Sequence, residues 1–127
     1  MRRRLPCEPR RPRPTQDILV ALNRCQRFRE YLQAGDDALS GMALDAILRN
    51  LAVVGEAARK LTDDARALFP AAPWHSIAGL RNVVIHEYFR IDVAIIRDIV
   101  DNEVAPLADA IRKHLDADTD DAADEQR

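Results

Sequence analysis

The chain has 127 residues, of which 47% are hydrophobic, 31% are charged and 5% are aromatic. This length suits one compact domain, and few aromatic residues with abundant alanine, leucine, isoleucine and arginine favour helices over a sheet. No apolar run approaches the roughly 18 residues that cross a bilayer, so we expect a cytoplasmic protein that does not enter the membrane.

The formal charge of −2 hides two oppositely charged ends. Residues 1–14 contain six arginines and one glutamate, whereas residues 116–127 contain six acidic residues and one arginine. We expect both ends to be disordered tails, which leaves a nearly neutral domain at 15–115. A nucleic-acid-binding protein led by the arginine-rich head is an alternative, because arginines bind RNA phosphates.

Apolar residues at three- and four-residue steps predict a first helix over about 16–34, with Thr15 as its N-cap and Gly35 as a left-handed stop. A second helix is predicted over about 38–61. Gly55 interrupts it at a cost of about 1 kcal/mol relative to alanine. We interpret Gly55 as a sign that another backbone approaches closely there.

A short helix is predicted over about 63–69, where Pro70 ends it. A fourth helix is predicted over about 74–87, because Pro73 stands near its first turn, where a missing N–H does no harm.

The final helix is predicted over about 93–115, with Asp92 as its N-cap. Pro106 removes one of its backbone hydrogen bonds, so we expect a kink or a break near 102–105. Four longer helices and one short helix predict an all-α, antiparallel up-and-down bundle.

Several residues that could suggest other sites have ordinary interpretations. Cys7 and Cys25 show no paired spacing, so we predict a buried thiol at Cys25 and neither a disulfide nor a zinc site. Trp74 is expected to anchor the core or an interface. His75 and His114 are expected at the surface or at the start of a helix.

The residues with the clearest chemical potential are Arg81, Asn82, His86 and Tyr88, at the end of the fourth predicted helix. Histidine can accept and return a proton near neutral pH, as cleavage through an RNA 2′-hydroxyl requires. Arginine can bind two phosphate oxygens and stabilise developing charge, and Asn82 could orient the imidazole. Alternatively, these side chains only satisfy the last helix carbonyls.

The spacing of Arg81 and His86 places them about 140° apart on an ideal helix, so they do not converge by spacing alone. Three arrangements remain open: the helix distorts near His86, the Arg81 side chain swings across, or a second subunit supplies the partner. We favour a two-fold dimer with these helices at its interface.

The pattern Arg81-Asn82-x-x-x-His86-x-Tyr88 resembles the R-x4-H-x-Y motif of HEPN domains, in particular the HepT-like ribonuclease toxins of bacteria and archaea. The resemblance covers about 16–115. It also includes Asp45-Ala46-x-x-Arg49-Asn50-Leu51, Gly55-Glu56-Ala57, Phe69-Pro70, Pro73-Trp74 and Ile77-Ala78-Gly79-Leu80. Glu87 departs from the pattern, because this position is often a small residue in the family.

The resemblance implies a five-helix HEPN bundle, a homodimer and a metal-independent endoribonuclease without a cofactor. Arg81, His86 and Asn82 would form the catalytic site in the dimer cleft, acting on RNA such as tRNA or mRNA. We consider Glu56 a supporting residue that either contacts the active-site helix or only forms a salt bridge with Arg81.

The resemblance also implies a toxin of a type VII-like toxin–antitoxin system. Its partner would be an MNT-type nucleotidyltransferase antitoxin that transfers AMP from ATP to Tyr88. The added phosphate would place negative charge where RNA should bind. The competing hypothesis is a non-enzymatic helical dimer that binds a nucleotidyltransferase or a nucleotide.

Overall fold

The computed structural model describes residues 14–33, 35–87 and 92–125, and describes the backbone alone at positions 83, 85–87 and 118–125. Its elements are, in chain order, α1 (Pro14–Arg29), the 3-10 helix η1 (Glu30–Gln33), α2 (Asp37–Arg59), α3 (Asp63–Ala67), α4 (Trp74–Glu87), α5 (Val93–Ile99), the π-helical turn η3 (Val100–Val104) and α6 (Ala105–Glu125). The all-α prediction is confirmed.

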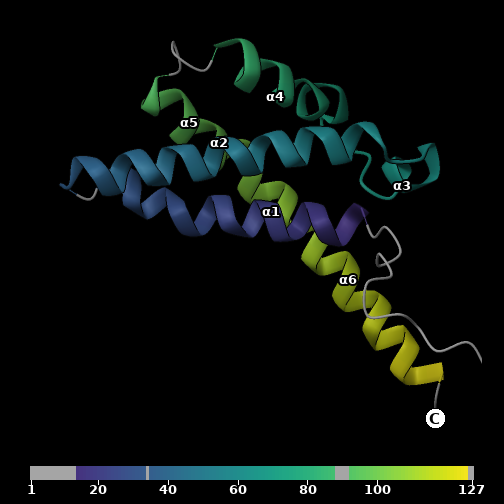
Figure 1. Ribbon diagram of the computed structural model, residues 1–127. Helices are drawn as coiled ribbons and strands as arrows, with labels where there is room; N and C mark the ends of the chain where they lie inside the picture. Colours follow the sequence, from purple (N-terminus) through teal and green to yellow (C-terminus); the bar gives the residue numbers. More distant parts are fainter. Residues whose placement is uncertain (1–13, 34, 88–91, 126–127) are drawn as a thin grey trace, which may run out of the picture.

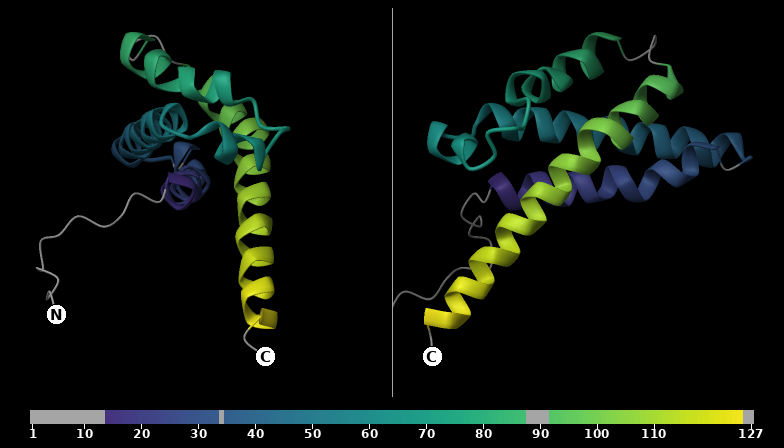
Figure 2. Two further views of the ribbon diagram at one scale, coloured as in Figure 1. Left: turned by 90° about the vertical axis from the view of Figure 1, so that its right-hand side faces the viewer. Right: turned by 180° about the vertical axis from the view of Figure 1, so that it is seen from behind.

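Helix α2 lies at the centre of the bundle (Figures 1 and 2). It packs along α1 on one side and beneath α4 on another, while α6 crosses behind α1. Its contribution to the core consists of Ala43, Ile47, Leu48, Leu51, Val54 and Ala58. By length and composition alone α2 could cross a membrane, but packing on two neighbours explains its apolar character in this fold.

An N-cap residue whose side chain accepts a backbone hydrogen bond precedes each of α2, α3 and α5. The Asp36 carboxylate accepts a hydrogen bond from the Ala38 amide at 2.9 Å. Thr62 accepts one from Ala65 at 3.1 Å, and Asp92 caps α5 as predicted. Each satisfies an amide that has no partner within its helix.

The first helix confirms one predicted end and corrects the other. Gly35 has a φ of 77°, the left-handed conformation predicted for it. Thr15 lies inside α1 and is not its N-cap, because α1 already begins at Pro14. Proline suits a first helical position, since its missing amide would have had no partner there.

The predicted irregularity before Pro106 is present as the π-helical turn η3, in which the Ala105 amide donates to the Val100 carbonyl. A π turn absorbs the disturbance without ending the helix. The turn is tied to α1, because the Arg29 Nε donates to Asp101 Oδ1 at 2.9 Å. A second hydrogen bond runs from Arg29 Nη2 to Asp101 Oδ2 at 2.8 Å, and the two bonds hold the pKa of Asp101 below its usual range.

The end of α6 corrects a boundary. We expected the last helix to end at 115, followed by a disordered acidic tail at 116–127, but α6 continues to Glu125 and projects beyond the bundle (Figure 2). Alanine has the highest helix propensity, and no glycine or proline interrupts this segment. The basic head at 1–13, including Cys7, lies outside the described residues.

A close backbone contact between two helices occurs at Gly55. A Cβ atom at this position would lie 2.9 Å from the Arg81 backbone nitrogen and 3.1 Å from the Ile77 carbonyl oxygen. No side chain larger than hydrogen fits without moving one helix. The predicted close approach is confirmed, and the helix that approaches is α4.

Gly55→Ala should therefore destabilise the protein by about 1–3 kcal/mol, because α2 and α4 must separate. Gly41→Ala is the matched control in the same helix, since a Cβ there meets nothing within 4 Å. The control should be neutral or stabilise by up to about 1 kcal/mol. Urea denaturation measures both changes, and equal effects of the two substitutions would contradict the close contact.

Candidate active site

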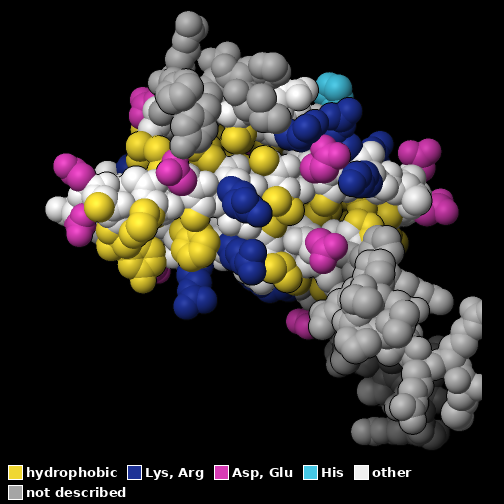
Figure 3. All heavy atoms as spheres, in the orientation of Figure 1, with side chains coloured by type: hydrophobic (Ala, Val, Ile, Leu, Met, Phe, Trp, Pro, Cys, Tyr) yellow, Lys and Arg dark blue, Asp and Glu magenta, His cyan; other side chains and the backbone are white. Residues whose placement is uncertain are grey.

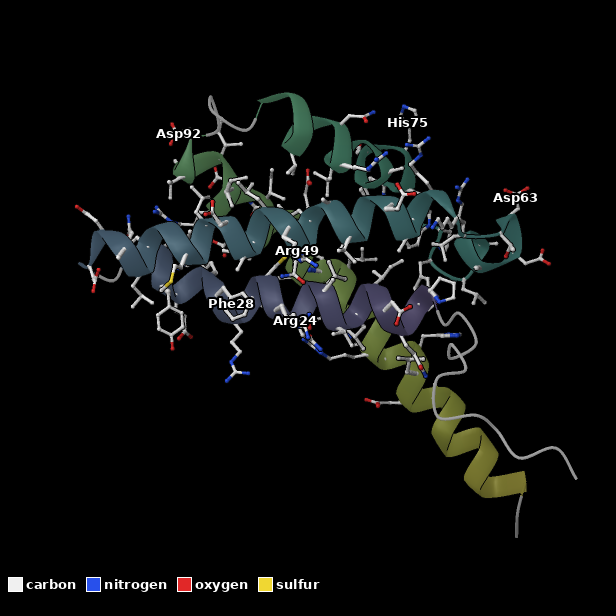
Figure 4. All side chains as sticks on the ribbon, viewed as in Figure 1. Arg24, Phe28, Arg49, Asp63, His75 and Asp92 are labelled. Carbon is white, nitrogen blue, oxygen red and sulfur yellow. The ribbon has the colours of Figure 1, made fainter. Side chains whose placement is uncertain are left out.

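The start of α4 is fixed by Trp74. Its indole Nε1–H lies 3.1 Å from the Arg66 carbonyl oxygen and 3.2 Å from that of Phe69, and its ring packs edge-on against Phe69. This satisfies the polar edge of a partly buried tryptophan. The expected anchoring role is confirmed. His75, the next residue, is exposed as predicted (Figure 4).

Arg81 faces α2 because of its place in the helical repeat of α4. Ile77 is buried against the core, and Arg81 lies one turn later on the same face of α4. The Arg81 Cβ lies only 3.3 Å from where a Cβ of residue 55 would be. The backbone contact at Gly55 therefore fixes the base of the arginine side chain.

The guanidinium group of Arg81 lies beside Glu56, the residue after Gly55. The Arg81 Nε lies 3.5 Å from Glu56 Oε2, and the two side chains are 43% and 42% exposed. Oε2 is shielded from solvent and accepts no hydrogen bond from the described residues. On the other oxygen, Lys60 Nζ lies 3.9 Å from Oε1. The considered salt bridge between Glu56 and Arg81 is confirmed.

Of the remaining predicted site residues, only Asn82 has a side chain that the structure describes. Asn82 is exposed on α4. The backbone of His86 lies in the last turn of α4, but its side chain is outside the described residues. Tyr88 lies outside them entirely. The described site is thus an arginine held against a carboxylate.

An open groove runs along α1 and α2 on the face shown in Figures 3 and 4. Its volume is about 630 Å³, and it is lined by Asp17, Val20, Ala21, Arg24, Phe28, Ala46, Arg49, Asn50 and Val53. At its floor the buried Asn50 donates to the Ala46 carbonyl at 2.7 Å. Val53 lies one turn before Glu56 on α2, so this end of the groove is the end nearer Glu56.

This groove was not predicted from the sequence. Its exposed apolar residues include Val20 at 51% and Val53 at 43%. The only available signal was that these residues lie away from the apolar stripes of their helices. Periodicity identifies the buried stripe, but it does not show which outer residues of two helices share a surface.

Two other residues have structural roles. Cys25 is fully buried, and burial raises the pKa of its thiol to about 12, so it is not a nucleophile near neutral pH. His114 was expected at the surface and is instead partly buried, because it packs edge-on against Phe69 at 5.3 Å between ring centres. The prediction for His114 was wrong because α6 passes beside the segment between α3 and α4, which contains Phe69.

Comparison with known families assigns the chain. The family model described as "Ribonuclease HepT-like" matches residues 18–114. The chain belongs to the HepT-like ribonuclease family. The match begins in α1 and ends within α6, and so includes Gly55, Glu56 and the whole of α4. The resemblance inferred from the motif is thereby confirmed.

Individual relatives agree with this membership. The "Putative RNase MJ1380" of Methanocaldococcus jannaschii is 36% identical over 88 residues, which cover 69% of this chain and 81% of the relative. The "Probable ribonuclease HepT" of Thermococcus cleftensis is 28% identical over 77% of this chain and 89% of its own length. No solved structure matches the chain significantly.

Proposed function

We propose that the protein is a metal-independent endoribonuclease in which Arg81 and His86 act on the RNA phosphodiester. The observation that carries this proposal is the half-exposed Arg81 side chain, fixed at its base by Gly55 and at its end by Glu56. A fixed, partly exposed guanidinium can bind phosphate oxygens and stabilise the charge that builds on them. Membership of a ribonuclease family supports the same reaction.

The proposed reaction requires one proton acceptor and one proton donor. As the RNA 2′-oxygen attacks phosphorus, its proton passes to an imidazole of His86. The bond from phosphorus to the 5′-oxygen then breaks, and that oxygen receives a proton from an imidazolium. The products are a 2′,3′-cyclic phosphate and a 5′-hydroxyl. Asn82 orients the imidazole or a substrate oxygen, and no cofactor enters this scheme.

We also propose that the active form is a homodimer. Two copies of His86 would supply the acceptor and the donor in one cleft. The groove on α1 and α2 offers a suitable face, since Val20 and Val53 in its lining are 51% and 43% exposed. Buried apolar surface drives association. A second copy on this face would lie near Glu56, the partner of Arg81, because Val53 is one turn before Glu56 on α2.

The biological role that we propose is that of a cytoplasmic toxin of a type VII-like toxin–antitoxin system, acting on tRNA or mRNA. Its antitoxin would be an MNT-type nucleotidyltransferase that transfers AMP from ATP to Tyr88. Tyr88 follows His86 by two residues, so the added phosphate would place negative charge next to the groups that meet RNA.

His86→Ala should lower the rate of RNA cleavage in EDTA by about 10²-fold or more, because proton transfer contributes that much. His75→Ala is the matched control, as an exposed histidine on the same helix, and should cut like the wild type. Cleavage is followed on a labelled oligonucleotide, with melting temperature as the check of folding. Undiminished cleavage or growth inhibition by the His86 variant would refute the proposal.

Val53→Glu should convert the dimer to a monomer, since it places a charge in the apolar face, and should reduce cleavage in parallel. Leu68→Glu is the control, because Leu68 is also exposed, at 52%, but lies outside the groove. Light scattering after size exclusion gives the mass. A Val53 variant that stays dimeric and active would place the interface elsewhere.

Co-expression with a minimal nucleotidyltransferase encoded beside the gene should add AMP to Tyr88 and suppress RNA cleavage. Mass spectrometry locates the modified residue, and Tyr88→Phe should stay unmodified and active. Modification of Tyr31, which is 43% exposed, in place of Tyr88 would contradict the assignment.

A further inference from the structure

We propose that Glu56 is a positioning residue that holds the Arg81 guanidinium by its Nε edge, so that the remaining N–H groups face the RNA phosphate. This inference rests on the proposed ribonuclease function and gives a role to a residue outside the Arg81-to-His86 motif. A group that acts through Arg81 in this way need not touch RNA itself.

The geometry restrains both ends of the Arg81 side chain. At the base, the backbone nitrogen and Cβ of Arg81 pack against Gly55. At the far end, Nε lies 3.5 Å from Glu56 Oε2. An unrestrained arginine has large rotamer freedom, which it must lose when it binds phosphate. Two fixed ends remove much of that loss before RNA arrives.

The state of the Glu56 oxygens supports the same role. Oε2 is shielded from solvent and lacks a hydrogen-bond donor among the described residues, although Arg81 Nε is near it. A shielded carboxylate oxygen is stabilised by a closely placed cation. A small approach of Nε would form a charge-assisted hydrogen bond, and such contacts often tighten only in the substrate complex.

Lys60 is the other cation near Glu56, but its geometry is weaker. Its Nζ lies 3.9 Å from Oε1, and its side chain is 73% exposed. An exposed pair one helical turn apart contributes little to stability. Arg81 is thus the partner that matters, and Lys60 provides a control that removes a charge neighbour of Glu56 without changing Arg81.

Simple electrostatics predicts the opposite effect of removing Glu56. A carboxylate beside a phosphate site repels RNA, so neutralising it should strengthen binding if charge alone mattered. Positioning instead predicts a slower chemical step, because Arg81 no longer meets the phosphate in the reactive geometry. The division between KM and kcat therefore separates the two roles.

The test uses the full chain and an RNA oligonucleotide that the wild type cuts. Glu56→Gln should lower kcat by about tenfold or more with KM unchanged or lower. Glu56→Asp should recover part of kcat. Lys60→Gln should stay within about twofold of the wild type, since a surface pair contributes little. Melting temperatures should show that every variant folds.

The decisive comparison is a double-mutant cycle with Arg81→Ala. Adding Glu56→Gln to this variant should cause no further loss of kcat, because the positioned group is already gone. Independent losses that multiply, or an unchanged kcat for Glu56→Gln, would overturn the inference while RNA cleavage by the wild type stands. A wild type that does not cut RNA would instead overturn the proposed function, and the inference with it.

Discussion

The backbone contact between α2 and α4 at Gly55 is the constraint on which the candidate site depends. Because residue 55 has no side chain, the Arg81 amide nitrogen can lie within 2.9 Å of the position that a Cβ would occupy. The next residue on α2 is Glu56, so the same contact brings a carboxylate to the arginine. The absence of a side chain at residue 55 thus determines how closely Arg81 packs against α2, where its side chain begins and which charged residue lies nearest to it.

The sequence was sufficient for the parts of this site that depend on local rules. A glycine inside an amphipathic helix signals a close approach, since its intrinsic cost must be offset by packing. The identity of the approaching helix was not available, because helical period does not fix which elements cross. For the same reason the groove formed by Val20 and Val53 was not predicted. The helix start at Pro14 was missed because Thr15 is a common N-cap residue type, and the helix beyond 115 was missed because the acidic residues of 116–127 indicated a disordered tail.

Electrostatics at the site combines two requirements that oppose each other. RNA binding favours net positive charge, yet the fixed arginine is paired with a carboxylate that partly cancels it. In the proposed ribonuclease, Glu56 would weaken the attraction of RNA to this position while it controls the direction of the Arg81 guanidinium.

The rigidity of Arg81 also limits how the proposed catalytic pair can meet. Both residues lie on α4, so turning the whole helix would not change the angle between them, and swinging the Arg81 side chain across would break its pairing with Glu56. The roughly 140° between the two positions must then be bridged by the end of α4 departing from an ideal helix or by a second copy of the chain. In the proposed dimer, a second copy on the groove face would approach the Glu56–Arg81 pair from outside the bundle and leave the α2–α4 packing intact. The contact that orients the arginine therefore favours a site completed between two protomers.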